Sequence, residues 1–186
     1  MPRPQESKCY TYADYCNWDD GGRWELIDGV AYAMAPAPSL QHQGVLVELL
    51  YKLRSFLEGK PCRVFVAPFD VRLNADTDDD IVVQPDIAIV CDSSKLDEKG
   101  CVGAPDMVIE VISPSSLRHD KLVKFQLYQK YGVREYWVVD PDNKMVTVHI
   151  LDNGKYDITV YGDENTVPAR VLEGCKVNLR EVFGWA

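Results

Sequence analysis

The sequence lacks any long hydrophobic run. Its first residues, MPRPQESKCYTY, contain no apolar segment of the kind found in a secretory signal peptide. No later segment approaches the roughly 18 uninterrupted apolar residues that are typical of a membrane-spanning helix. We therefore expect a soluble, cytoplasmic protein with no membrane partner.

The six cysteines lack the short spacing of a zinc site. No two of them form a C-x-x-C pair, and none has a histidine close to it in the sequence, whereas a structural zinc ion needs ligands at short characteristic intervals. Because no secretory signal is present, we expect reduced, mostly structural thiols and no zinc. The cysteines are Cys9, Cys16, Cys62, Cys91, Cys101 and Cys175.

Positive charge is also scarce. The 20 Lys and Arg residues face 29 Asp and Glu residues, which gives a formal net charge of −9. This balance argues against a protein that coats nucleic acid non-specifically, because such affinity comes from neutralising phosphates. The acidic run Asp76, Asp78, Asp79 and Asp80 is interpreted as a solvated loop. A local basic face can still coexist with an acidic whole, and its candidates are Arg118, Lys121, Lys124, Lys130 and Arg134.

The length of 186 residues fits one domain better than two, since single domains usually span roughly 100–200 residues. The chain has no internal repeats, no low-complexity segments and no linker. We therefore expect residues 1–186 to form a single domain.

Turn signals and alternation predict several antiparallel hairpins. WELI and VAYAMA flank Asp28-Gly29, a dipeptide that supplies the positive φ angles of a tight primed turn. Further along, EYWVVD, MVTVHIL and YDITVY are typical of an antiparallel meander. Within the first hairpin, Glu25 is a minor candidate for a functional residue.

Two helices are predicted from caps and helical periodicity. The first spans residues 39–58, with Ser39 as its N-cap and Gly59 as its stop, and the second spans residues 117–131. His42 lies on the apolar face of the first helix, at its open end, so it is either a hydrogen-bonded core residue or a ligand. With the strands, these helices predict an α/β fold: a mixed central sheet flanked by helices, extended by antiparallel hairpins.

An acidic residue interrupts the apolar segment IVVQPDIAIV. Pro85 cannot donate a ladder hydrogen bond, so it predicts a sheet edge or a bulge just before Asp86. Bulges commonly re-aim a side chain beside an active site. The alternative is a strand-end carboxylate satisfied by turn amides, which is disfavoured by the apolar residues that follow: Ile87, Ile89 and Val90.

A second acidic residue, Glu110, lies within the strand predicted for DMVIEVI. It shares one face with Val108, and an opposite charge such as a metal or a lysine would keep its pKa from rising there. In the helix that follows, Asp120, Lys124 and Tyr128 form one seam. The seam could be a surface Asp–Lys pair worth roughly a few tenths of a kcal/mol. Its position directly after the strand of Glu110 favours a cleft instead.

Taken in order, these segments resemble a known family. The succession ELIDG, H, QPD, IEVISPSS, D-x-x-x-K-x-x-x-Y and GVREYWVVD is similar to the Uma-two-type endonuclease family of bacteria, long labelled a domain of unknown function. That family belongs to the restriction-endonuclease-like superfamily, which carries the PD-(D/E)xK signature. The resemblance covers roughly residues 10–183 and implies a restriction-endonuclease-like core.

By this resemblance, Pro85-Asp86 is the PD of the signature and Glu110 is the acid of the following strand. The lysine of the signature normally lies two residues after that acid, where this chain has Ile112. In similar families the lysine has moved onto the next helix, and Lys124 is the matching residue. The glutamate that the superfamily carries on its first helix is not evident. Supporting places are assigned to His42, Ser113, Asp120 and Tyr128.

The implied activity is Mg²⁺- or Mn²⁺-dependent hydrolysis of phosphodiester bonds, with DNA as the expected substrate. Asp86 and Glu110 would hold the hard cation, which lowers the pKa of a bound water and stabilises charge on the phosphate. Lys124 would orient that water or neutralise the developing charge.

Two other functions stay open. One is a catalytically silent member that binds nucleic acid or a protein partner. The other is an inverting glycosidase that uses the same two carboxylates, although Lys124 and the absence of a sugar-stacking motif argue against it. A homodimer is also expected, because duplex cleavage needs two opposed sites and two-fold pairing is the commonest association. Candidate interface residues are Tyr10, Tyr12, Tyr15 and Trp18.

Overall fold

The computed structural model describes residues 9–34, 39–112 and 119–184, with the backbone alone for residues 119–121. The described helices are α1 (Tyr12–Tyr15), α2 (Leu40–Phe56), α3 (His119–Tyr131) and α4 (Leu179–Phe183). The strands are β1 (Trp24–Ile27), β2 (Val30–Ala33), β3 (Arg63–Val66), β4 (Asp70–Arg72), β5 (Val82–Val83), β6 (Ile87–Val90), β7 (Gly100–Val102), β8 (Met107–Val111), β9 (Glu135–Asp140), β10 (Met145–Asp152), β11 (Lys155–Gly162), β12 (Thr166–Pro168) and β13 (Lys176–Asn178).

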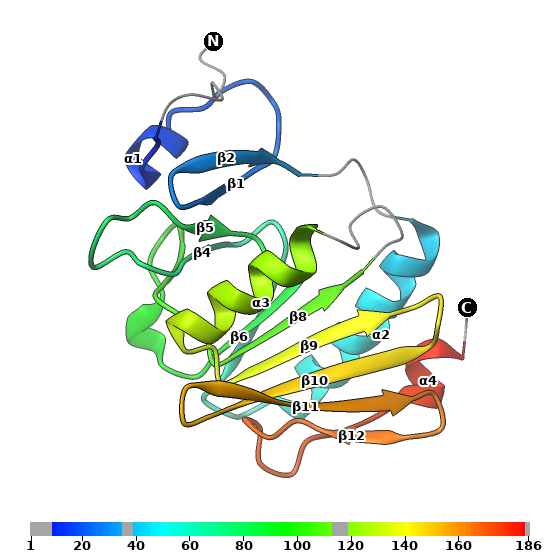
Figure 1. Cartoon of the computed structure of the whole chain (residues 1–186). Helices are drawn as coiled ribbons and strands as arrows, with labels where there is room; N and C mark the ends of the chain where they lie inside the picture. The colour runs from blue at the N-terminus through cyan, green and yellow to red at the C-terminus, as the bar shows by residue number, and fades with distance from the viewer. Residues whose placement is uncertain (1–8, 35–38, 113–118, 185–186) are drawn as a thin grey trace.

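The predicted α/β class is confirmed, with two larger sheets in place of one central sheet. The described strands form a six-stranded sheet in the order β11-β10-β9-β8-β6-β3 and a five-stranded sheet in the order β2-β1-β5-β4-β7, and β12 pairs with β13. Both larger sheets are mixed, because β8 runs parallel to β9 and β4 runs parallel to β7. Helices cover both faces of the six-stranded sheet (Figure 1).

Local signals place the predicted hairpin and the first helix correctly. β1 and β2 pair antiparallel around Asp28 (φ 48°) and Gly29 (φ 75°), as the Asp-Gly turn predicts. At the start of α2, the Ser39 hydroxyl accepts a hydrogen bond from the backbone N–H of His42. Gly59 follows the helix with φ 72°, a left-handed conformation that glycine adopts readily.

The segment around Pro85 corrects one prediction. It does not lie at a sheet edge, because among the described strands β5 is flanked by β1 and β4 and β6 is flanked by β3 and β8. Instead, the chain leaves the five-stranded sheet after β5 and enters the six-stranded sheet at β6. Where the chain passes between sheets, the backbone N–H does not have to donate to a neighbouring strand, so proline at position 85 leaves no hydrogen bond of either sheet unmade. Asp86 therefore lies at the corner between the sheets, where its carbonyl accepts a hydrogen bond from the N–H of Ala67 at 3.2 Å.

The six-stranded sheet separates two cores, which decides where its alternate side chains point. Ile87 and Ile109 belong to the core under α2 and α4. Ala88 and Val108 belong to the core that contains Tyr128 of α3 and residues of the five-stranded sheet. Because side chains alternate along a strand, Glu110 lies on the same face of β8 as Val108. That face carries α3 (Figure 1).

Two of the aromatic residues proposed for a dimer interface are part of the chain's own core. Tyr10 and Tyr12 are buried with Leu26 and Val82 in a small apolar cluster. They cannot meet a partner without unpacking this cluster, so that part of the interface prediction is wrong.

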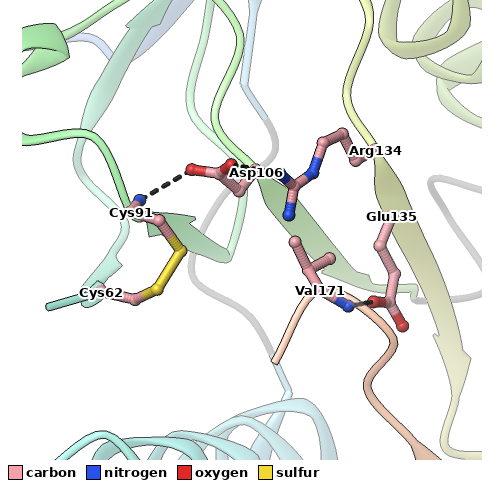
Figure 2. Close-up of a disulfide and its surroundings, with 6 residues drawn as sticks. All are labelled: Cys62, Cys91, Asp106, Arg134, Glu135 and Val171. Carbon is pink, nitrogen blue, oxygen red and sulfur yellow. Dashed lines mark hydrogen bonds and ion pairs between the residues drawn. A yellow bond between two sulfur atoms is a disulfide. The ribbon is translucent and has the colours of Figure 1, made fainter. Parts of the chain in front are cut away.

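Two cysteines predicted to be reduced form a disulfide, Cys62–Cys91 (Figure 2). Cys62 directly precedes β3 and Cys91 directly follows β6, and these strands pair with Arg63 opposite Val90. The pairing brings together two residues that are 29 positions apart in the chain. The remaining cysteines are free: Cys9 and Cys16 are exposed, Cys101 and Cys175 are buried.

A hydrogen bond anchors the backbone beside this disulfide. The N–H of Cys91 donates to the Asp106 carboxylate at 2.7 Å, and Arg134 approaches the other oxygen of Asp106 at 3.4 Å (Figure 2).

Among the described residues, no helix has the length and hydrophobicity that crossing a bilayer requires.

Candidate active site

Asp86 and Glu110 are brought together by the pairing of β6 with β8. These strands are antiparallel with Ile87 opposite Ile109, and one further step in this register places Asp86 opposite Glu110. The backbone N–H of Val111 donates to Oδ2 of Asp86 at 2.8 Å, which ties the corner before β6 to the end of β8. The two predicted carboxylates thus lie at neighbouring positions.

Asp86 is held through one of its two oxygens. Oδ2 accepts the Val111 N–H and lies 3.2 Å from Nε2 of His42. No described residue donates a hydrogen bond to Oδ1, and the side chain is 21% exposed. One carboxylate oxygen is therefore fixed by the protein, and the other is available to a ligand.

His42 is a hydrogen-bonded core residue that contacts the site. It is 7% exposed and comes from the first turn of α2. Burial alone would lower the pKa of His42, but the hydrogen bond and the charge of Asp86 outweigh it, so the pKa lies above the usual 6.5. The other ring nitrogen, Nδ1, is buried and has no hydrogen-bond partner among the described residues.

Glu110 receives two hydrogen bonds on the same oxygen, both from α3. Nζ of Lys124 lies 3.0 Å and the hydroxyl of Tyr128 lies 2.8 Å from Oε1 of Glu110. Burial raises the pKa of Glu110 to about 7; Lys124 opposes this rise, and the charges of Asp86 and Glu25 add to it. No described residue donates to the second oxygen, and the side chain of Glu110 is 12% exposed.

Lys124 is clamped between two carboxylates. Its Nζ lies 2.9 Å from Oε1 of Glu25 and 3.0 Å from Oε1 of Glu110, and the residue is 7% exposed. Burial alone would lower the pKa of Lys124, but the two carboxylates outweigh it and raise the pKa well above the usual value. Lys124 is therefore a buried ammonium group.

Glu25 is a full member of this cluster, although its sequence context made it only a minor candidate. It is 6% exposed, and its Oε1 accepts both the Lys124 ammonium and the backbone N–H of Gln84 at 2.9 Å. A charged residue within the apolar tetrapeptide WELI was the available signal. The sequence indicates no role for Gln84 beyond its place in the QPD segment, because an amide carries no chemical signal of its own; its side chain joins a further polar network.

The remaining predicted residues divide into described and undescribed ones. Ser113 lies outside the described residues, and of Asp120 only the backbone position in α3 is described. Two residues of the expected basic face have other partners: Lys124 lies in the buried cluster, and Arg134 forms an ion pair with Asp106. Lys130 is exposed, and the side chains of Arg118 and Lys121 are not described.

The donor set fits a hard cation held mostly by water and substrate. Within the described ranges, no three carboxylate, imidazole or thiol groups converge on one point where they could hold a metal. Mg²⁺ does not need such a cage, because it commonly uses one or two carboxylates and retains several waters. Asp86 and Glu110 each offer an oxygen that accepts no hydrogen bond from a described residue.

Comparison with known proteins gives three similarities. The sequence model of the Uma2 family, described as "Putative restriction endonuclease", matches residues 11–180. "Uncharacterized protein slr1290" of Synechocystis sp. is 26% identical over 152 residues, which cover 80% of this chain and 78% of that protein.

A solved structure is also similar, that of "a putative nuclease belonging to DUF820" from Anabaena variabilis. It matches with a TM-score of 0.74 over 95% of this chain and 98% of its own. The sequence identity is 21%, so this likeness shows a shared fold.

Proposed function

The chain belongs to the Uma2 family, and on that premise we propose that it is a Mg²⁺- or Mn²⁺-dependent endonuclease that hydrolyses phosphodiester bonds of DNA. The observation that supports this most strongly is the position of Asp86 and Glu110 at the same end of the paired strands β6 and β8, where Val111 donates to Asp86 at 2.8 Å and the ammonium of Lys124 lies 3.0 Å from Glu110. Two adjacent carboxylates beside a buried lysine provide the groups that metal-assisted phosphodiester hydrolysis requires.

Asp86 and Glu110 are the residues that would hold the cation, through the oxygens that accept no hydrogen bond from a described residue. When bound, such a cation lowers the pKa of a coordinated water and stabilises negative charge on the scissile phosphate. The positions of the two carboxylates are fixed in advance. Val111 and His42 hold Asp86, while Tyr128 and Lys124 hold Glu110.

Lys124 would act as a charged hydrogen-bond donor. Glu110 and Glu25 raise its pKa well above the usual value, so it would act as a protonated donor and not as the general base. An ammonium in a partly dehydrated site can stabilise the charge that develops on the phosphate. Glu25 would hold this ammonium in place together with Glu110.

A catalytically silent module is the second candidate. The cluster of Glu25, Lys124 and Glu110 is complete without a cation, because both carboxylates contact the same ammonium. Such a cluster could persist for structural reasons alone. A silent module would still bind divalent metal at Asp86 and Glu110 but would cleave no nucleic acid.

A cleavage assay separates these functions. Duplex DNA, single-stranded DNA and RNA are each incubated with the parent protein in Mg²⁺, in Mn²⁺ and in EDTA. The parent should cleave DNA in either metal and nothing in EDTA, and Asp86→Asn should lose cleavage. Asp157→Asn is the matched control, since Asp157 is exposed on the edge strand β11. Metal binding without cleavage of any substrate would instead identify a silent module.

A further inference from the structure

Arg23 directly precedes β1, the strand that carries Glu25 of the candidate active site. Its carbonyl accepts a hydrogen bond from the N–H of Met34, so the residue extends the β1–β2 ladder by one step. Because side chains alternate along a strand, Arg23 lies on the same face of the hairpin as Glu25. Glu25 is buried against Lys124, whereas Arg23 is exposed.

A buried glutamine fixes the guanidinium of Arg23. Nε and Nη2 of Arg23 both donate to Oε1 of Gln84, at 3.2 and 2.8 Å. The backbone N–H of the same Gln84 donates to Glu25, and Asp86 follows two residues later. Arg23 is therefore attached to the segment that carries the first predicted metal ligand.

The orientation of Gln84 is itself determined by its neighbours. Its amide Nε2 donates to Oδ1 of Asp70 at 2.9 Å and contacts the hydroxyl of Tyr15 at 3.0 Å, and that hydroxyl donates to Asp70. With the NH₂ group committed to the Asp70 side, the carbonyl oxygen faces Arg23. The negative end of the amide dipole thus holds a cation in place without neutralising its charge.

Arg23 keeps a full positive charge on the surface. Among the described residues, it makes no ion pair with a carboxylate, whereas Arg72, Arg134 and Arg180 each do. The N–H groups that do not contact Gln84 have no described partner. A planar guanidinium with free donors matches the geometry of a phosphate group.

Resting on the proposed nuclease function, we infer that Arg23 binds a backbone phosphate of the nucleic acid beside the cleavage centre. The net charge of −9 repels a polyanion at long range, so a productive complex needs fixed local cations. Arg23 supplies one whose position relative to Asp86 is set by Gln84. It makes the same contact before and during the reaction, so it contributes to substrate binding and not to the chemical step.

Steady-state cleavage of a short fluorescein-labelled DNA duplex, at saturating Mg²⁺ and several NaCl concentrations, tests this role. Arg23→Gln should raise KM about tenfold, as expected for a charge-assisted hydrogen bond, and leave kcat nearly unchanged. Its dependence of log KM on log salt should be shallower by about 0.9, the contribution of one phosphate contact to duplex DNA. Arg23→Lys should be intermediate, because it keeps the charge but not the planar fork.

Arg63→Gln is the matched control. Arg63 is exposed at the end of β3 that lies farthest from Asp86, and its substitution should change neither KM nor the salt dependence. If Arg23→Gln lowers the melting temperature but leaves KM and its salt dependence at parent values, Arg23 serves only the polar network and the inference is wrong. A parent protein that cleaves no nucleic acid would instead overturn the proposed function, and this inference with it.

Discussion

Replacing Lys124 with methionine removes the ammonium that two buried carboxylates share. Methionine keeps most of the apolar stem of lysine, so the substitution leaves little empty space. Glu25 and Glu110 both lie within 3.0 Å of Nζ in the parent protein and lose that partner together. Asp86, whose charge already acts on Glu110, adds to the repulsion that remains.

The expected loss of stability is large for a single substitution. Removing one partner of a buried ion pair costs roughly 3–5 kcal/mol. Glu110 can relieve part of this by taking up a proton, because burial already raises its pKa to about 7. We therefore expect a loss near the lower limit, about 3 kcal/mol at pH 7. For a chain of this size, that corresponds to a melting temperature lower by about 6–12 °C.

Protonation of Glu110 also determines how the stability of Lys124→Met changes with pH. Without Lys124, the pKa of Glu110 in the folded protein rises further above its value in the unfolded chain. An acid with a raised folded pKa destabilises the fold progressively as pH increases through that pKa. The deficit of Lys124→Met relative to the parent should therefore be smaller at pH 6 than at pH 8.

Urea unfolding in EDTA at both pH values measures these differences. Lys130→Met is the matched control, because Lys130 is an exposed lysine of the same helix, and it should unfold with the parent. Adding Glu25→Gln to Lys124→Met should recover part of the loss by removing one stranded charge. If Lys124→Met unfolds at the same urea concentration as the parent, the carboxylates do not depend on the ammonium and the argument fails.

Three further predictions concern the scaffold. Burial lowers the pKa of His149, so the stability of the folded protein decreases as pH falls below about 6.5 and the unfolded chain takes up the proton first. In urea unfolding between about pH 6.5 and 5, His149→Gln should lose less stability than the parent, and an equal loss would contradict this. The Cys62–Cys91 disulfide spans 29 positions and should contribute about 3–4 kcal/mol to the free energy of unfolding, so reductant should lower the urea midpoint. Titration of the unreduced, denatured protein should find only the four free thiols, and six thiols would refute the disulfide. A Cβ at Gly100 would lie 2.1 Å from the carbonyl oxygen of Asp70, so Gly100→Ala should cost about 1–3 kcal/mol, and a parent-like melt would show that β7 yields freely.

Elements that depend on local signals could be predicted from the sequence. The hairpin at Asp28-Gly29 follows from the φ angles that its turn requires, and α2 follows from its Ser39 cap and apolar face. At Pro85 the sequence predicts an edge or a bulge, because it does not show that the chain passes to a second sheet there. The Cys62–Cys91 disulfide could not be predicted from the sequence either, since it depends on the pairing of β3 with β6.

The site shows how far a charge within an apolar strand can guide prediction. This signal predicts Asp86 and Glu110 as metal ligands and makes Glu25 a minor candidate. It fails for Glu135, which opens the apolar strand EYWVVD and is fully buried. There, the N–H of the Trp137 indole and the backbone N–H of Val171 satisfy the two carboxylate oxygens at 2.7 and 2.8 Å.

Only tertiary structure distinguishes these two kinds of buried acid. Glu135 uses both oxygens within the protein (Figure 2 shows its contact with Val171). Asp86 and Glu110 each keep an oxygen to which no described residue donates a hydrogen bond. The number of unsatisfied oxygens depends on neighbours from distant parts of the chain, so sequence spacing alone could not have separated a structural acid from a candidate ligand.

Calorimetric titration with Mn²⁺ tests the central claim most directly, because it measures the cation site without requiring a substrate. The parent protein should bind Mn²⁺, and Asp86→Asn and Glu110→Gln should each abolish that binding, since each removes one of two carboxylate ligands. Lys124→Met should retain it, because the ammonium contacts the carboxylates and not the cation. Equal Mn²⁺ binding by the parent, Asp86→Asn and Glu110→Gln would contradict the assignment of these two carboxylates as the metal site.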